Sequence, residues 1–234
     1  DGSVATATNY AVDPSPSGAV KPRAVSVADF NGDDIPDLVW ATGPIAYEFQ
    51  FGSRAFLDAV VRQSWTTPGT LFAAEATRLA VEGDTLLGME IGFHAPELRK
   101  RGAALAPCFG ALIERGDWTQ ADVDGLLERA AQAAWLNPVT RPGRYYIHAL
   151  AVKPEQRGKK IGVALIEDAM RRGREAGFGS LELDVLSDNP AVRFYRSMGL
   201  ELYAETRAPA PEAYGVPPAG RICGLYTTAA ADDT

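Results

Sequence analysis

The sequence predicts one α/β domain built on a mixed sheet. Apolar runs at 77–81 and 85–91 flank the turn at 82–84, a pattern typical of a β hairpin. A third apolar run, at 145–152, leads through a glycine-bearing turn into a helical pattern at 160–176. Strand and helix patterns then alternate to the end of the chain. Such alternation favours a single domain with helices packed on a sheet.

The N-terminal third contains the weakest patterns. Residues 1–19 are small and polar with several prolines, so we expect a disordered tail, and residues 229–234 are similar. The domain would then span residues 20–228. Residues 20–27 predict a first strand, and residues 35–41 lie inside a first helix.

Two helical regions flank the predicted hairpin. Phe56, Val60 and Val61 have helical spacing and predict a second helix that ends near Pro68. After the hairpin, residues 95–142 are helical in pattern. Thr119 is placed as an N-cap with Asp122 three residues later. The face expected to be apolar consists of Val123, Leu126, Leu127, Ala130 and Ala134.

The last elements are short and are separated by glycine. The helix at 160–176 is closed by Gly177, and a helix at 190–198 ends at Gly199, as expected of C-terminal caps. The expected strands of this region are 180–186, 200–206 and 222–227.

Composition limits the class of protein. Hydrophobic residues make up 46% and charged residues 23% of the chain, as in globular proteins, and no run approaches the ~20 apolar residues that span a membrane. The net charge of −7 argues against general binding of nucleic acid and mildly favours a basic substrate. Cys108 and Cys223 are too few and too far apart for a disulfide framework or a metal site. We expect a cytoplasmic protein, although a chain that begins with Asp1 leaves a removed leader open.

The turn at 157–162 (Arg-Gly-Lys-Lys-Ile-Gly) joins a predicted strand to a predicted helix. Its backbone N–H groups and the positive end of the helix dipole would point at one spot, which suits a pyrophosphate. Cations at a helix N-terminus oppose the dipole, so a purely structural turn is the weaker interpretation. The segment lacks the Gly-x-x-x-x-Gly-Lys-Ser/Thr pattern of a nucleotide P-loop.

A second segment, at 189–200, begins with Asn189 and Pro190. Asn as N-cap and Pro at the first helical position explain this pair on structural grounds alone. Together, however, the segments at 145–173 and 189–200 resemble the acyl-CoA-binding core of the GNAT (Gcn5-related) N-acetyltransferase superfamily. The resemblance covers about residues 20–228.

The resemblance implies a mostly antiparallel sheet of six to seven strands, flanked by helices, with a helical insert at about 95–142 between the third and fourth strands. It implies acetyl-CoA as co-substrate and an amine-bearing acceptor, with no nucleic acid or membrane as partner, and leaves a homodimer open. The activity implied is transfer of acetyl to a primary amine of a small molecule or protein by direct attack. The alternative is a non-catalytic acyl-CoA sensor.

Site residues follow from the same resemblance. In the family pattern Arg/Gln-x-x-Gly-x-Gly/Ala, Lys160 stands in the place of the first glycine. This departure leaves the N–H group of residue 160 free to donate a hydrogen bond. Asn189 would contact the CoA arm, and Tyr195 would return a proton to the departing thiolate, since a phenol stays protonated at neutral pH. The strand backbone at Leu150, Ala151 and Val152 would pair with pantetheine and supply N–H groups to the developing oxyanion, and the turn at Arg157, Gly158, Lys159, Lys160, Ile161 and Gly162 would wrap the pyrophosphate.

The general base is less clear from the sequence. Strand alternation places Tyr146, His148, Leu150 and Val152 on one face. Tyr146 occupies the position of the glutamate found in histone-type members of the family. His148 is the candidate base because imidazole titrates in a useful range, although a packed core histidine is the competing interpretation. Glu90 on the neighbouring strand is a second candidate base, and water could also take the proton.

The acceptor is not identified by any residue pattern. The helical insert is expected to cover the acceptor site, where Trp118 and Trp135 could lie. A solvated acidic face with buried tryptophans is the interpretation we favour for this insert. The acidic residues concerned are Glu114, Asp117, Asp122 and Asp124.

Residues 29–37 (Asp-Phe-Asn-Gly-Asp-Asp-Ile-Pro-Asp) also resemble the Asp-x-Asn-x-Asp loop of calcium-binding repeats. Only one copy is present, Asp34 stands where the tight-turn glycine is usual, and Trp40 stands where a bidentate glutamate is usual. A strand and loop leading into a helix is therefore favoured, and no metal site is expected. A calcium-dependent adhesive module is a third functional hypothesis.

Overall fold

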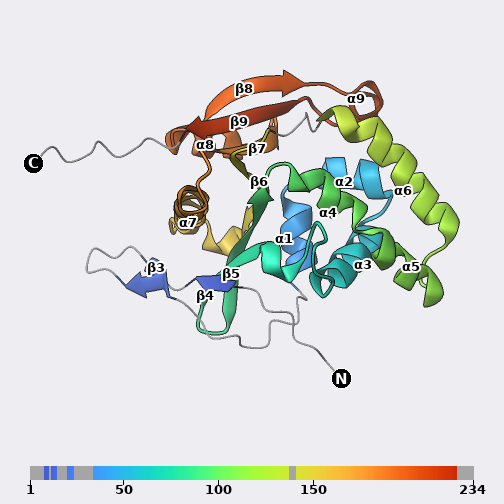
Figure 1. The fold of residues 1–234 in the computed structure, drawn as a ribbon, viewed down its shortest axis with the longest axis horizontal. Coiled ribbons are helices and arrows are strands. Elements are labelled where there is room, and N and C mark those ends of the chain that lie inside the picture. The colour runs from blue at the N-terminus through green and yellow to red at the C-terminus, as the bar shows by residue number, and fades with distance from the viewer. Residues whose placement is uncertain (1–7, 11, 15–19, 24–33, 137–140, 226–234) are drawn as a thin grey trace, which may run out of the picture.

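The computed structural model describes residues 8–10, 12–14, 20–23, 34–136 and 141–225. These residues form a mixed sheet of seven strands in the order β1-β4-β5-β6-β7-β9-β8 (Figure 1). Its strands are β1 (Thr8–Tyr10), β4 (Thr77–Glu82), β5 (Thr85–His94), β6 (Arg144–Val152), β7 (Ser180–Leu186), β8 (Glu201–Thr206) and β9 (Ala219–Leu225). The prediction of an α/β domain with a mixed sheet is confirmed.

Most neighbouring strands are antiparallel. The β4–β5 hairpin forms as predicted, and β5 pairs with β6 in the same sense. The parallel pairs are β1–β4 and β6–β7. The strand β9 lies between β7 and β8 and is antiparallel to both. A separate two-stranded sheet joins β2 (Val12–Pro14) and β3 (Val20–Arg23).

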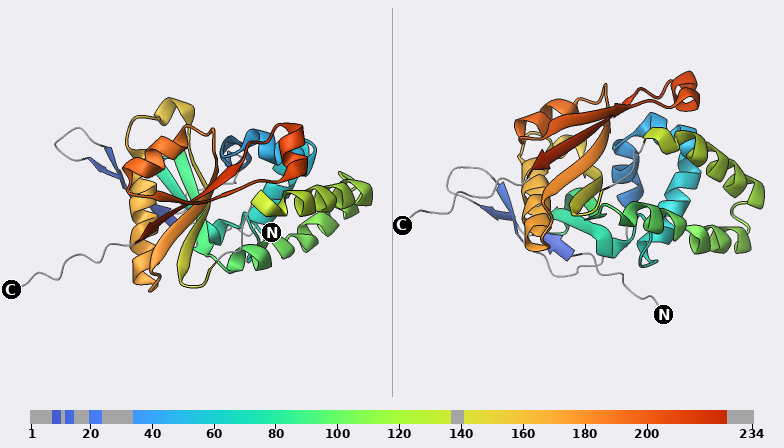
Figure 2. Two further views of the ribbon diagram at one scale, coloured as in Figure 1. Left: turned by 90° about the horizontal axis from the view of Figure 1, so that it is seen from above. Right: turned by 45° about the horizontal axis from the view of Figure 1, so that its top comes forward.

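Helices cover both faces of the large sheet (Figure 2). On one face lie α7 (Ile161–Glu175) and α8 (Ala191–Ser197), which share a buried cluster with β6 and β7. The other face packs against the first three helices and the helices between β5 and β6. These and the remaining helix are α1 (Ile35–Ala41), α2 (Pro44–Phe51), α3 (Arg54–Trp65), α4 (Glu97–Ala103), α5 (Ala106–Glu114), α6 (Gln120–Ala133) and α9 (Pro209–Tyr214). Three 3₁₀ turns, at Ala74–Ala76, Ala134–Leu136 and Pro154–Gln156, complete the described elements.

Local sequence explains several helix ends. The Ser53 side chain accepts a hydrogen bond from Phe56 N at 3.2 Å and so caps α3. Thr119 and Asp122 form a reciprocal capping box at the start of α6, as predicted from their spacing. The predicted apolar face of α6 is wrong at Leu127, which is 53% exposed, and at Ala134, which is exposed just beyond the end of the helix. The residues that α6 buries are Val123, Leu126 and Ala133.

Two helices were not predicted. Both α2 and α9 begin with a proline in the first turn, which is a recognised start signal. They end at Gly52 and Gly215, whose φ angles of 75° and 100° are in the left-handed region. Each is short, at eight and six residues, so apolar periodicity could not reveal it.

The N-terminal predictions need correction. Parts of the expected tail form β1 and β2, which pair with β4 and β3. The first strand of the large sheet is therefore β1, whereas the predicted strand at 20–27 supplies only β3 to the small sheet. The remaining residues of these predictions, and the predicted tail at 229–234, lie outside the described residues.

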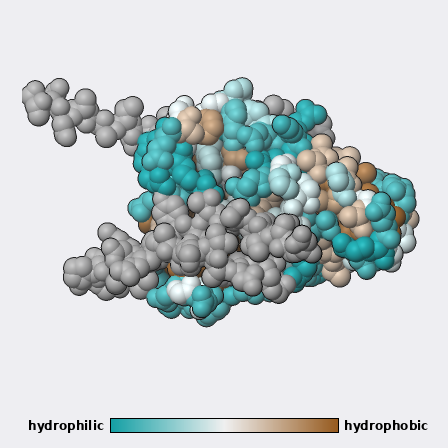
Figure 3. Space-filling view, turned by 60° about the horizontal axis from the view of Figure 1, so that its bottom comes forward, coloured by the Kyte–Doolittle hydropathy of each residue, from teal (hydrophilic) through white to brown (hydrophobic). Residues whose placement is uncertain are grey.

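The surface of the described residues is mixed in polarity. On the face shown in Figure 3, hydrophobic residues lie in small groups among hydrophilic ones. The large hydrophobic side chains that are exposed come from α2, α6, β8 and α9: Ile45, Leu127, Leu202, Tyr203 and Tyr214. A search of the described helices for one long and apolar enough to cross a membrane found none.

Candidate functional site

The edge of β6 is open where the strand approaches its C-terminal end. Residues 144–147 of β6 pair in parallel with residues 180–183 of β7. Beyond Ile147, β6 continues to Val152 paired only with β5, and β7 beyond Leu183 pairs only with β9. Within the described part of the chain, residues 148–152 thus have one edge without a strand partner. An extended, amide-bearing molecule can add to such an edge.

A β-bulge lies at the start of this open edge. Ile147 pairs with Gly92, but Ala149 pairs with Ile91, so His148 is an extra residue on β6. An extra residue reverses the alternation of side chains beyond it.

The predicted face of β6 is therefore wrong. Tyr146 belongs to the core beneath the N-terminal helices, and the ring of His148 packs beside it. Leu150 and Val152 instead pack on the opposite side, with the first turns of α7. The Tyr146 hydroxyl, at the position of the family's glutamate, donates to Asp184 Oδ2 at 3.0 Å.

His148 lies among aromatic rings. Its ring centroid is 5.5 Å from that of Phe72, 6.1 Å from Phe93 and 6.4 Å from Tyr146. Burial lowers the pKa of His148 to about 4, so the imidazole is neutral at pH 7. Its Nε2 atom is buried and has no hydrogen-bond partner among the described residues. A neutral ring with a spare nitrogen can accept or donate one hydrogen bond to a ligand.

Glu90 is not brought to the same place as His148. It is fully buried, and its Oε2 atom lies 2.5 Å from Arg172 Nη2 on α7, on the side of the sheet away from the N-terminal helices. Burial raises the pKa of Glu90, and the charge of Arg172 opposes that rise. A carboxylate held in this pair is poorly placed to act as the base at the open edge.

The turn between β6 and α7 has a strained residue at its end. Gly158 has φ of 81°, and Lys160, the N-cap of α7, has φ of 62°. Lys160 is the single non-glycine residue with positive φ among those described. This geometry explains why the family pattern places glycine at this position, since a side chain is disfavoured in the left-handed region.

The start of α7 is open to an anion. No side chain caps the helix, and its first turn has no acidic residue. The N–H groups of a first helical turn lack acceptors within the helix. Lys159 Nζ binds Gln156 Oε1 at 2.8 Å, and Arg157 Nε binds Val152 O at 3.4 Å, so basic side chains surround the junction. The arrangement favours a phosphate group.

The second sequence segment lies against this turn. A Cβ atom added to Gly162 would be 3.3 Å from Cζ of Phe194, so the ring of α8 contacts the first turn of α7. The neighbouring Tyr195 ring is 5.3 Å from that of Phe194 between centroids. The structure therefore brings the two segments together, as the sequence predicted.

Tyr195 is buried near the base of the opening. It shares a cluster with Ile147 and Leu183, the last residues to pair between β6 and β7. Burial raises the pKa of Tyr195 to about 12, which keeps the hydroxyl protonated at neutral pH. The N-cap of α8 is Pro190 and not Asn189 as predicted; Asn189 Oδ1 accepts from Ala191 N, the first residue of the helix, at 2.9 Å.

A family model of GNAT acetyltransferases matches residues 118–200. Over these residues the chain is similar to the GNAT family. They include β6, α7 and α8, which carry the open edge, the turn and Tyr195. The predicted resemblance is confirmed for this segment. A second model, of FG-GAP repeats, matches residues 22–44, which contain the acidic loop and α1.

A curated relative is similar to part of this chain. An uncharacterised N-acetyltransferase of Schizosaccharomyces pombe is 37% identical over 67 residues, which are 28% of this chain and 41% of that protein. The chain thus spans less than half the length of this relative.

Solved structures show the same fold. A crystal structure of an acetyltransferase has a TM-score of 0.60 at 17% identity, with 86% of this chain and 97% of that chain covered. An N-acetyltransferase of Staphylococcus aureus Mu50 has a TM-score of 0.59 at 13% identity, with 82% of this chain and 93% of that chain covered. A structure described as SsHAT has a TM-score of 0.55 at 17% identity, with 93% of this chain and 98% of that chain covered. The chain has a GNAT-like α/β fold with a mixed sheet flanked by helices.

The helices α5 and α6, which precede β6 in the chain, pack mainly on other helices. The main contacts of α5 are with α3, and those of α6 are with α2 and α9 (Figure 1). Trp118 stacks on Phe56 at 4.5 Å between centroids. The side chain of Trp135 lies outside the described part of the chain.

The acidic residues of this region serve the helices themselves. Asp122 caps α6, and the hydrogen bonds from Thr119 lower its pKa. Asp124 accepts from Gln120 at 2.8 Å, and Asp117 pairs with Arg115 at 2.9 Å. These contacts agree with a solvated acidic face, the interpretation favoured from sequence.

Most of the acidic loop that resembles a calcium site lies outside the described residues. Of its C-terminal part, Asp34 pairs with Lys153 at 2.8 Å, and Asp37 pairs with Arg54. Among the described residues no group of three or more His, Cys, Asp or Glu could hold a metal ion.

Two features of the GNAT region escaped sequence analysis. The bulge at His148 depends on the register between β5 and β6, which no residue pattern reports. The buried contacts of Arg172 join α7 to two strands. Gly92, inside an otherwise apolar strand, was the available signal for both, since an isolated glycine there often marks a bulge or close packing.

Proposed function

We propose that this chain transfers an acetyl group from acetyl-CoA to a primary amine of a small molecule or protein by direct attack. The observation that carries the proposal is the open edge of β6, which leads directly into the uncapped start of α7. A CoA molecule has both matching parts: an extended arm with amides and a charged diphosphate. We propose that the domain begins with β1, extends to about residue 228 and acts in the cytoplasm.

The residues at this junction fit the cofactor. The backbone of Leu150, Ala151 and Val152 lies on the open edge and can pair with pantetheine as an added strand. The first-turn N–H groups at Ile161 and Gly162, with the charges of the turn, can hold the diphosphate. The left-handed φ angles of Gly158 and Lys160 suit a turn whose successive N–H groups converge on an anion. Bound acetyl-CoA would supply an acetyl group activated as a thioester.

Tyr195 is suited to give a proton to the leaving sulfur. Its pKa of about 12 keeps the hydroxyl protonated, so it can donate a hydrogen bond to the sulfur as negative charge develops there. Backbone N–H groups of the open edge would stabilise the developing oxyanion, where one well-placed donor contributes ~2.7–4 kcal/mol.

His148 would receive the hydrogen bond of the attacking amine. Its neutral ring and its buried, unpartnered Nε2 support this role. A base with a pKa of about 4 accepts a proton weakly, so His148 would orient the amine and pass its proton to water rather than store it.

The first test is binding of CoA and acetyl-CoA by calorimetry, followed by detection of free thiol with a panel of primary amines. We expect binding without an amine and thiol release with one. Failure to bind would contradict the proposal outright. Binding with no acetylation of any amine would contradict catalysis and favour the sensor.

A further inference from the structure

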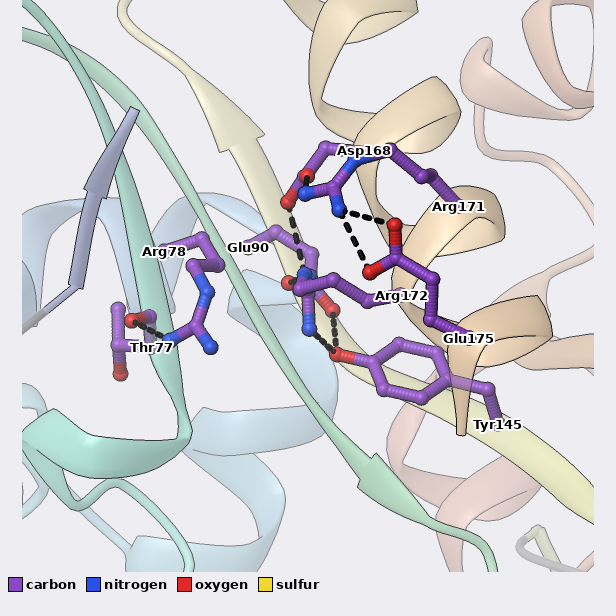
Figure 4. Close-up of polar contacts among 8 residues, drawn as sticks. All are labelled: Thr77, Arg78, Glu90, Tyr145, Asp168, Arg171, Arg172 and Glu175. Carbon is purple, nitrogen blue, oxygen red and sulfur yellow. Dashed lines mark hydrogen bonds and ion pairs between the residues drawn. The ribbon is translucent and has the colours of Figure 1, made fainter. Parts of the chain in front are cut away.

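Arg172 of α7 contacts three buried groups, one on its own helix and two on the sheet beneath it (Figure 4). Its Nη2 atom lies 2.5 Å from Glu90 Oε2, its Nε lies 2.7 Å from Asp168 Oδ2, and its Nη1 donates to the hydroxyl of Tyr145. That hydroxyl in turn donates to Glu90 Oε1 at 3.0 Å. We call these four side chains the Arg172 cluster.

The Arg172 cluster is a buried set of charges with two carboxylates and one guanidinium, and Arg171 Nη2 also lies 2.6 Å from Asp168 Oδ1. Glu90 is fully buried and Asp168 is 4% exposed. Burial tends to lower the pKa of Arg172, but Glu90 and the other partners outweigh this and raise it. Arg78 on β4 faces the cluster and donates to Thr77 O at 3.1 Å (Figure 4). Removing one partner from such a set leaves a buried charge uncompensated, so its geometry is held firmly.

The cluster spans the β-bulge. A Cβ atom on Gly92 would overlap both Glu90 Oε1 and the Tyr145 hydroxyl, so these two side chains meet above a residue that has none. Gly92 is the residue at which the register between β5 and β6 shifts. Glu90 lies before that shift on β5, and Tyr145 lies on its other side on β6. Their hydrogen bond therefore fixes the two strands across the position that inserts His148.

A single helix connects this cluster with the phosphate-binding turn. The first residue of α7, Ile161, packs with Val152 at the far end of β6. Arg172, three turns later, lies over Tyr145 near the beginning of the same strand. The ends of α7 thus hold the two ends of β6, with the open edge between them.

We propose that Arg172, acting through Glu90 and Tyr145, is a positioning residue that fixes the β-bulge and so sets the direction of His148 and of the open edge of β6. It touches no reacting group. The catalytic consequence rests on the proposed function, whereas the effect on the bulge does not.

The test removes one hydroxyl with Tyr145→Phe. Arg172 keeps Glu90 and Asp168, so the fold should persist while the link across the bulge is lost. We expect kcat to fall about tenfold, since small misplacements at a reacting centre have large effects. The KM for acetyl-CoA should rise by a smaller factor than kcat falls, because the turn at the other end of α7 is untouched although the open edge of β6 shifts. Tyr214→Phe removes the same group from a residue that is 51% exposed, and should change neither constant.

A second readout needs no activity. The chain has two histidines, His94 and His148, so the imidazole signals in NMR spectra can be assigned by comparison with His148→Gln. We expect Tyr145→Phe to move the His148 signals and Tyr214→Phe to leave them in place. If Tyr145→Phe is too unstable, Glu90→Gln serves instead. The amide oxygen still accepts from Tyr145, but the ion pair between residue 90 and Arg172 is lost, so the His148 signals should again move.

The outcomes are distinct. Unmoved His148 signals, or an unchanged kcat in an active enzyme, would overturn the positioning role. If the unaltered protein acetylates no amine, the proposed function fails while the NMR comparison still decides whether the cluster holds the bulge.

Discussion

The ring of Phe194 contacts the backbone of Gly162, with 3.3 Å between its Cζ and the place a Cβ would take. This contact joins the start of α7, where the turn ends, to α8, where Tyr195 lies. A small residue at position 162 therefore allows α8 to approach the start of α7 closely.

Gly162→Val should push α8 away from α7 and weaken binding of CoA by about tenfold or more, as expected when one or two phosphate contacts are lost. The control is Gly110→Val in α5, where an added Cβ would meet nothing within 4 Å. Calorimetry with CoA measures both. Equal affinities for the two variants would show that the contact does not shape the site.

Lys160→Gly should stabilise the fold, because Lys160 alone among the described non-glycine residues has positive φ. Relief of left-handed strain is worth about 1–2 kcal/mol, partly offset by the greater freedom of glycine in the unfolded chain. We expect the free energy of unfolding to rise by up to about 1 kcal/mol in urea titrations. A loss of stability would contradict the strained conformation. Lys159→Gly, one residue earlier, should give no such gain.

Tyr195→Phe should reduce kcat by about 100-fold, the lower part of the range for loss of a general acid. Affinity for CoA should be nearly unchanged, since the ring remains packed in the core. Tyr203→Phe, at a residue 52% exposed on β8, is the matched control. An unaltered kcat in Tyr195→Phe would remove the hydroxyl from the mechanism.

His148→Gln should flatten the dependence of stability on pH between about 4 and 6.5. The folded pKa of about 4 is below the ordinary value of 6.5, so in this window the unfolded chain binds the extra proton. The stability that the neutral ring contributes is complete above pH 6.5 and is lost as the pH falls toward 4. Across this window the free energy of unfolding changes by up to about 3 kcal/mol, and by less where solvent screens the partly exposed ring. The free energy of unfolding is measured for both proteins at pH 4.5 and at pH 7. An equal change between the two pH values in the variant and in the unaltered protein would refute the lowered pKa of His148.

Calcium should not stabilise the protein. Asp34 and Asp37, in the segment that matches the FG-GAP model, are paired with Lys153 and Arg54 in the described structure. These ion pairs connect α1 with the residue after β6 and with α3. We expect the same melting temperature with about 1 mM calcium, a concentration that fills even weak sites, and with chelator. A rise with calcium would support the calcium-binding hypothesis.

The sequence by itself determined the elements whose causes are local. The β4–β5 hairpin follows from its turn, the start of α6 from Thr119 and Asp122, and the β6–turn–α7 unit from its glycines. These signals act within a few residues, where hydrogen bonding and allowed φ angles are decided. They sufficed for the α/β class and for the resemblance to the GNAT family.

Only the tertiary structure decided which side chains meet. The extra residue at His148 depends on the pairing of β6 with β5, and it moved Leu150 and Val152 to the face opposite Tyr146. The pairing of Glu90 with Arg172 joins residues 82 positions apart, which excluded Glu90 as the base at the open edge. Register and long-range ion pairs are set by packing between whole elements, because their free energy is gained only when the sheet and α7 assemble together.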